Sequence, residues 1–213
     1  MIISHKHRFI FFAVPRTATH AVREALRPHL DENDWEQKIL HGESSIPIPE
    51  IAALKHGHIS FRQIESYLSR EVRDSYFKFA FVRNPFDRFI SACFFLNRKN
   101  PDFRGREIIT IKQLFQRDAF RRRMLILPQY QFLIDNADQI AMDYIGRYET
   151  LQESWNEICT HIGIKPEKLP EKNVSEHARY SDYYDTELKE AIEKFYSKDL
   201  ELFRYAWQNG ATG

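Results

Sequence analysis

Arginine, threonine and histidine side chains follow a short apolar run near the start of the chain. Residues 8–14 are rich in aromatic and β-branched side chains, which is typical of a strand buried on both faces. The turn that follows reads Pro15-Arg16-Thr17-Ala18-Thr19-His20, and apolar residues then recur at helical spacing in 21–26. The free N–H groups and positive dipole end of such a helix bind anions, phosphate above all. Arg16 adds a positive charge and the threonine hydroxyls add donors, so the sequence predicts a phosphate-binding turn.

This turn contains no glycine. A Walker-type loop needs two spaced glycines followed by lysine, and a dinucleotide-binding loop needs three glycines. We therefore expect neither ATP nor NAD as the ligand. The alternative is an ordinary strand–loop–helix connection in which Arg16 is a solvated charge.

A second junction between a strand and a helix follows residues 77–82, which alternate and then become continuously apolar. Asn84 is a favourable N-cap and Pro85 a favourable first helical residue. Arg83 stands at the carboxyl end of the strand, where α/β sheets bind ligands, and Ser91 lies two turns into the helix. The alternative is that Arg83 and Arg88 are surface charges and Ser91 an ordinary helix serine.

His56 and His58 lie between these two junctions, on irregular chain of the kind that often presents functional side chains. The helix that follows is predicted to run from residue 61 to about residue 73, since Ser60 and Gln63 have the spacing of a capping box. The alternative is a pair of solvated loop histidines. The other histidines are scattered and offer no third ligand, so we do not predict a metal site.

Length and composition restrict the class of protein. The chain has 213 residues, 43% hydrophobic residues and a formal net charge of +1, which favours one folded domain and gives no overall attraction to nucleic acid or membranes. No run approaches the ~20 apolar residues that span a bilayer, and residues 8–14 are too short for a signal peptide. Cys93 and Cys159 lie in apolar helical patterns and are expected to be buried thiols. We expect a soluble, cytoplasmic protein.

The rest of the chain alternates between predicted strands and helices. Thr150 and Glu153 have the spacing of a second capping box, and Arg121-Arg122-Arg123 is either a solvated face or a site for an anionic acceptor. The alternation predicts an α/β fold with a parallel, doubly wound sheet. The expected elements are an exposed excursion at 31–52, a mobile loop at 98–108, a helix at 110–123, a strand at 140–148, and helices at 150–163 and 184–199.

These segments resemble the sulfotransferases that use 3′-phosphoadenosine 5′-phosphosulfate. The turn at 15–20 resembles their phosphosulfate loop, Pro-Lys-Thr-Ala-x-Thr-Ser, and residues 83–91 resemble their second signature, which holds the 3′-phosphate. Lys55-His56-Gly57-His58 is similar to the histidine segment of the carbohydrate branch, which includes the uronyl 2-O-sulfotransferases. Further similar segments follow in the expected order: Pro128-Gln129, Gly146 to Leu151, Asn173-Val174-Ser175 and Tyr183-Tyr184-Asp185.

The resemblance implies a single sulfotransferase domain over 1–213, with a P-loop-like parallel sheet flanked by helices. It implies in-line transfer of the sulfuryl group to a hydroxyl of a saccharide or glycoconjugate, without a metal, and with adenosine 3′,5′-bisphosphate as product. His56 and His58 are the candidate bases, and the sequence does not choose between them. Arg16 would stabilise the leaving phosphate. The implied cofactor-binding residues are Pro15, Arg16, Thr17, Ala18, Thr19, His20, Arg83, Ser91, Asn173 and Ser175.

The chain departs from the family pattern in two ways. Arg16 replaces the lysine of the loop, and a guanidinium with a pKa above ~12 stabilises charge but does not donate a proton. His20 and Ala21 replace Thr-Ser, which removes two hydroxyl donors, although His20 can supply one donor. Two alternatives therefore remain: a degenerate paralogue that binds the nucleotide or a glycan without turnover, and a P-loop-like kinase, which the missing glycines disfavour.

Overall fold

A computed structural model describes residues 1–37, 46–170 and 178–208 of the chain. The fold divides into two compact units. The first takes in Met1–Val82 and Gln129–Lys172, and the second takes in Arg83–Pro128 and Asn173–Gly213. One domain over 1–213 stays a prediction.

A five-stranded mixed sheet forms the centre of the first unit, in the order β3-β1-β2-β4-β5. Strands β2, β4 and β5 are parallel, whereas β1 is antiparallel to both β2 and β3. Phe12 pairs with Ala80 and Val82 pairs with Arg147, so these three parallel strands end at one edge of the sheet. The strands are β1 (Ile2–Ser4), β2 (Phe9–Phe12), β3 (Trp35–Glu36), β4 (Phe77–Val82) and β5 (Tyr144–Arg147).

The sheet is parallel at its centre, as predicted, but its β1 side is antiparallel. Strands β1 and β3 are three and two residues long, too short to show a period of two in the sequence. The prediction of an exposed excursion at 31–52 is wrong at Trp35–Glu36, because β3 pairs there with β1 and Glu36 is buried. Residues 38–45 of that segment lie outside the described residues.

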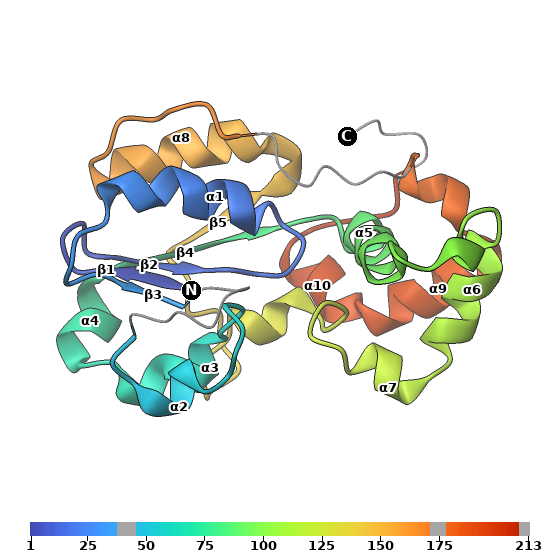
Figure 1. The fold of residues 1–213 in the computed structure, drawn as a ribbon, viewed down its shortest axis with the longest axis horizontal. Coiled ribbons are helices and arrows are strands. Elements are labelled where there is room, and N and C mark those ends of the chain that lie inside the picture. The colour runs from blue at the N-terminus through green and yellow to red at the C-terminus, as the bar shows by residue number, and fades with distance from the viewer. Residues whose placement is uncertain (38–45, 171–177, 209–213) are drawn as a thin grey trace. The chain divides into compact units, whose positions relative to one another are not determined.

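Helices cover both faces of this sheet (Figure 1). Helices α1 and α8 lie on one face, and α2, α3 and α4 lie on the other. The α-helices are α1 (Thr19–Leu26), α2 (Pro49–Ala52), α3 (Phe61–Ile64), α4 (Arg70–Ser75) and α8 (Leu151–Ile162). The short 3₁₀ helices of this unit are η1 (Arg27–His29), η2 (Glu65–Tyr67), η4 (Gln129–Phe132) and η5 (Tyr148–Thr150).

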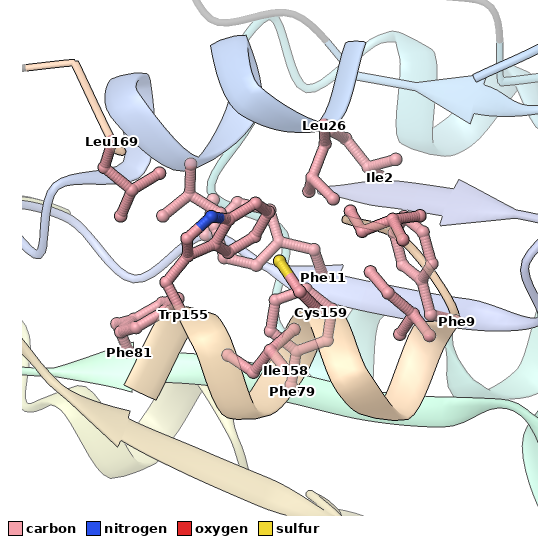
Figure 2. Close-up of a cluster of buried hydrophobic side chains, with 14 residues drawn as sticks. Ile2, Phe9, Phe11, Leu26, Phe79, Phe81, Trp155, Ile158, Cys159 and Leu169 are labelled. Atoms are coloured by element: carbon pink, nitrogen blue, oxygen red, sulfur yellow. The ribbon is translucent and has the colours of Figure 1, made fainter. Parts of the chain in front are cut away.

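The core explains why β2 is apolar at every position. Phe9 and Phe11 point to the face that α1 and α8 cover, where they join a buried cluster with Trp155 (Figure 2). Phe12 points to the opposite face and packs against Phe61 of α3, with the ring centroids 5.7 Å apart. A strand covered on both faces needs apolar side chains on both, so the continuous apolar run correctly predicts a central strand.

Two predicted features of the helices differ from the structure. The helix expected from residue 61 to about residue 73 is α3, η2 and α4, because a second N-cap, Ser69, starts α4. The capping box of Ser60 and Gln63 is confirmed. The one predicted at Thr150 is wrong, since its side chain caps no N–H of α8.

The second unit packs around α5, which carries the apolar stripe predicted after Pro85. The N-cap prediction is confirmed, because the Asn84 side chain accepts a hydrogen bond from the Phe86 N–H at 3.0 Å. The predicted helices at 110–123 and 184–199 are each divided in two. The helices are α5 (Pro85–Asn97), η3 (Pro101–Phe103), α6 (Glu107–Phe115), α7 (Asp118–Arg121), η6 (Tyr180–Tyr183), α9 (Thr186–Phe195) and α10 (Ser197–Leu202).

Cys93 and Cys159 are buried free thiols, as predicted. Within the described ranges, every helix is too short or too polar to cross a membrane.

Gly146 in β5 allows α8 to pack closely on the sheet. A Cβ atom at this position would lie 2.7 Å from a ring carbon of Phe81 and 2.9 Å from Cβ of Ser154. The Ser154 hydroxyl accepts a hydrogen bond from the Arg147 N–H at 3.2 Å, so helix and strand are also tied together beside the glycine.

We predict that Gly146→Ala lowers the free energy of unfolding by about 1–3 kcal/mol, because overpacking forces neighbouring groups to move. Urea denaturation measures this effect. The double variant Gly146→Ala/Phe81→Leu should recover part of the loss, since leucine lacks the ring atoms that clash. An unchanged urea midpoint in Gly146→Ala would contradict the assignment of this contact.

Candidate functional site

The turn after β2 has the backbone of an anion-binding loop. Arg16 and Ala18 adopt left-handed conformations, with φ angles of 66° and 61°. Such a conformation costs a residue with a side chain on the order of 1–3 kcal/mol, and strain of this kind gathers at ligand-binding sites. Backbone turns that use it form concave sets of N–H groups that bind anions.

The start of α1 adds to this positive character. Ala18 is the N-cap of α1, and its side chain caps no N–H group. The first turn contains no acidic residue, and the first helical bond runs from the Val22 N–H to the Ala18 carbonyl at 3.2 Å. Because the earlier N–H groups of a helix have no intrahelical partner, this end suits an anionic ligand.

The threonines of the turn lie beneath its surface. The Thr17 hydroxyl donates to the Val14 carbonyl at 2.9 Å and closes the loop on itself. Thr17 and Thr19 are both buried, whereas Arg16 is partly exposed and His20 is exposed. The Thr17 hydroxyl therefore shapes the loop, and the phosphate contacts expected of both threonines stay a prediction.

The imidazole of His58 is held in one tautomer by Ala13, the residue that follows β2. Its Nδ1 lies 2.7 Å from the carbonyl oxygen of Ala13, and His58 is 6% exposed. A carbonyl only accepts hydrogen bonds, so Nδ1 carries the proton and Nε2 keeps its lone pair. Burial lowers the pKa of His58 to about 3, so the ring is neutral at neutral pH. A neutral imidazole with a fixed tautomer can act as a base through Nε2.

His56 differs from His58 in its surroundings. It is half-buried, and burial is the main cause that lowers its pKa. Its Nδ1 has no hydrogen-bond partner among the described residues. Nothing comparable to the Ala13 carbonyl therefore fixes its tautomer, which makes His58 the better-oriented base.

Arg83 and Ser91 of the second predicted junction are both buried. The Arg83 side chain pairs with Asp87 one helical turn later, with Nε 2.6 Å from the carboxylate oxygen. Ser91 is 0% exposed, so a phosphate would reach its hydroxyl only after the side chains that cover it move. The alternative of surface charges is wrong for both Arg83 and Arg88, which are buried. Asp87 orients Arg83, and the i, i+4 spacing of the two residues signalled this pair.

Arg88 of the same signature is a structural residue. It is 0% exposed, and its Nη2 donates to the Leu127 carbonyl at 2.6 Å. The guanidinium also lies over the Tyr196 ring, 5.4 Å from the centroid. Arg88 therefore holds the chain after α7 within the second unit.

Three groups around the candidate site carried no recognisable signal in the sequence. The Ala13 carbonyl is a main-chain group, Arg23 lies inside a predicted amphipathic helix, and Glu36 lies in the segment expected to be exposed. Asn173 and Ser175 lie outside the described residues, so their role stays a prediction. In the part of the chain that the structure covers, no three His, Cys, Asp or Glu side chains gather as metal ligands do.

The low pKa of His58 makes the stability of the protein depend on pH. Free histidine has a pKa of 6.5 and His58 in the fold has one of about 3, so between these values only the unfolded chain binds the proton. Above pH ~6.5 the titration of His58 does not lower the free energy of unfolding. As the pH drops from ~6.5 toward ~3, this free energy falls by up to about 1.4 kcal/mol per pH unit. His58→Asn removes this titration and keeps an amide donor for Ala13.

We expect wild type to lose about 2 kcal/mol more than His58→Asn between about pH 7.5 and pH 5 in urea unfolding experiments. Equal losses in the two proteins would show that His58 titrates normally in the fold.

Comparison with known proteins shows which family this chain resembles. The model of the sulfotransferase family matches residues 1–206. Carbohydrate sulfotransferase 10 of Xenopus laevis is 26% identical over 96% of this chain and 67% of its own length. Carbohydrate sulfotransferase 11 of Rattus norvegicus is 22% identical over 98% of this chain and 68% of its own length. An uncharacterized protein of Archaeoglobus fulgidus is 31% identical over 50% of this chain and 82% of its own length.

No solved structure gives a significant match to the chain. The family match, however, runs through both strand–helix junctions and the histidine segment between them. The chain therefore belongs to the sulfotransferase family.

Proposed function

We propose that this protein transfers a sulfuryl group from 3′-phosphoadenosine 5′-phosphosulfate to a hydroxyl of a saccharide or glycoconjugate. The observation that carries the proposal is the imidazole of His58, fixed by the Ala13 carbonyl just before an anion-binding loop. Membership of the sulfotransferase family and the names of the two carbohydrate sulfotransferases support it.

The loop at 15–20 suits the phosphosulfate end of this donor. Its two left-handed residues and the uncapped start of α1 offer main-chain N–H groups to an anion. Arg16 would add a charge that stays positive at every physiological pH, so it stabilises the leaving phosphate without donating a proton. His20 at the exposed start of α1 would supply a side-chain donor where the family has a hydroxyl.

Arg83 is the proposed ligand of the 3′-phosphate, with Asp87 orienting its guanidinium. Arginine suits this role because its planar fork matches the oxygens of a phosphate. Ser91 would join it once the side chains over its hydroxyl move.

His58 is the proposed general base. Its Nε2 would take the proton from the acceptor hydroxyl as the oxygen attacks in line. The Ala13 carbonyl would then accept a hydrogen bond from Nδ1 of a charged imidazolium, which stabilises that charge. A pKa of about 3 makes His58 a weak base alone, but it would rise with an anion held in the nearby loop, because an opposite charge favours the protonated ring.

The proposed acceptor is an anionic saccharide. Residues 98–123 carry nine Lys or Arg against three Asp or Glu, although the whole chain has a formal net charge of +1. A local excess of positive charge attracts anionic ligands and speeds their encounter. Some of these cations have partners, such as Lys112 with Asp185 at 2.8 Å.

Donor binding tests the loop. Calorimetry should show binding of adenosine 3′,5′-bisphosphate and much weaker binding of ATP, which would exclude a kinase. Arg16→Ala should lower the affinity for the bisphosphate by about 10–100-fold, because one charge-assisted contact is lost. Arg62→Ala is the control and should bind as wild type does, because Arg62 pairs with Asp138 on exposed chain. Equal affinities for both variants would remove Arg16 from the site.

Turnover tests the base. Labelled sulfate should be transferred faster to acidic than to neutral polysaccharides in a panel of acceptors. His58→Asn should lower kcat by about 10²–10⁴-fold, while the binding of the bisphosphate is retained. His56→Asn is the matched control and should keep most of the activity. If His56→Asn abolishes turnover and His58→Asn does not, the base is His56. Bisphosphate binding without transfer to any acceptor would identify a degenerate paralogue.

A further inference from the structure

Arg23 is a buried cation on α1, five residues after the N-cap Ala18. It is 2% exposed, and its side chain lies among segments that are distant in the sequence. Nη1 lies 2.9 Å from a carboxylate oxygen of Glu36 in β3 and donates to the Gln37 carbonyl at 3.0 Å. Nη2 donates to the Gly57 carbonyl at 3.0 Å. One guanidinium thus joins α1, the end of β3 and the histidine segment.

Gly57 stands between the two candidate bases, His56 and His58. The segment is therefore held at two adjacent residues: Arg23 and the Met1 amino group both donate to the Gly57 carbonyl, and the Ala13 carbonyl binds the His58 ring. The Arg23 contact comes from the helix that follows the loop, and the Ala13 contact from the chain that precedes it. Together they set where the histidine segment lies relative to the anion-binding loop.

We propose that Arg23 is a positioning residue for the His58 base, acting through the Gly57 carbonyl; this inference rests on the proposed function. Arginine is needed because its planar fork reaches a carboxylate and two carbonyls at once. The ammonium of a lysine is a single point and cannot span Glu36 and Gly57 together. Glu36 also binds Arg27, at 3.0 Å, so the carboxylate keeps one cation if Arg23 is replaced.

The charge of Arg23 has an effect on His58 that is separate from its geometry. Burial is the main cause of the low pKa of His58, and the positive charges of the Met1 amino group, Arg23 and His56 lower it further. The Ala13 carbonyl opposes them. Arg23 therefore favours the neutral ring in the resting protein and also weakens it as a base, and Arg23→Lys keeps this charge effect while it changes the geometry.

Arg23→Lys is the decisive variant, because it keeps the positive charge and loses the planar guanidinium with its two terminal nitrogens. We expect kcat to fall at least about 10-fold, with the KM of the acceptor and the affinity for adenosine 3′,5′-bisphosphate within about threefold of wild type. Arg27→Met is the matched control. It removes a cation from the same carboxylate but leaves the Gly57 contact, so its kcat should stay within about threefold of wild type.

A readout independent of activity is the ¹⁵N NMR spectrum of His58. Wild type and Arg27→Met should show the Nδ1–H tautomer, whereas Arg23→Lys should show a mixture of tautomers. If Arg23→Lys does not fold, Arg23→Met/Glu36→Met takes its place, because replacing both partners leaves no stranded carboxylate.

The two readouts separate this inference from the proposed function. An inactive wild type with a changed His58 spectrum in Arg23→Lys would reject the function and support the positioning role. An active wild type with equal kcat in Arg23→Lys and Arg27→Met would overturn the positioning role alone. A loss of kcat with an unchanged His58 spectrum would also overturn it, since Arg23 would then act elsewhere.

Discussion

The need to bury β2 on both faces governs the first unit. Phe9 and Phe11 require α1 and α8 on one face of the sheet, and Phe12 requires α3 on the other. The chain leaves β2 at the edge where all three parallel strands end, so the loop at 15–20 and α1 begin there. The same burial brings the chain before α3 back to β2, where His58 meets the Ala13 carbonyl. Hydrophobic packing therefore decides where the polar groups of the candidate site lie.

Arg23, Lys78 and Arg88 are buried cations that bind main-chain carbonyls. A buried charge is costly unless it is paired or hydrogen-bonded, and carbonyls of irregular chain need donors for the same reason. Each such side chain consequently fixes a segment that has no regular hydrogen bonding of its own. The examples are Arg23 with Gln37 and Gly57, Lys78 with Arg73 and Tyr76, and, in the second unit, Arg88 with Leu125 and Leu127.

The loop at 15–20 takes, without any glycine, a backbone conformation that suits an anion. Arg16 and Ala18 take left-handed angles that glycine adopts without strain, and the Thr17 hydroxyl holds the turn from beneath. The side chains then present a different surface from a glycine-rich loop, with a permanent cation at Arg16 and an imidazole at His20. A loop of this kind favours a ligand with several negative charges, as the proposed donor has.

Local patterns in the sequence determined much of this protein. The apolar runs correctly predicted β2 and β4, and the Ser60 and Asn84 caps correctly predicted two helix starts. The residues of both strand–helix junctions indicated the family. Those features depend on neighbours in the chain, so their signals survive in one sequence. Only the tertiary structure decided that β1 is antiparallel, that Thr17 faces inward and that His58 has the more fixed ring. These depend on contacts between distant segments, often with a main-chain carbonyl such as Ala13 or Gly57, and a carbonyl is the same at every residue.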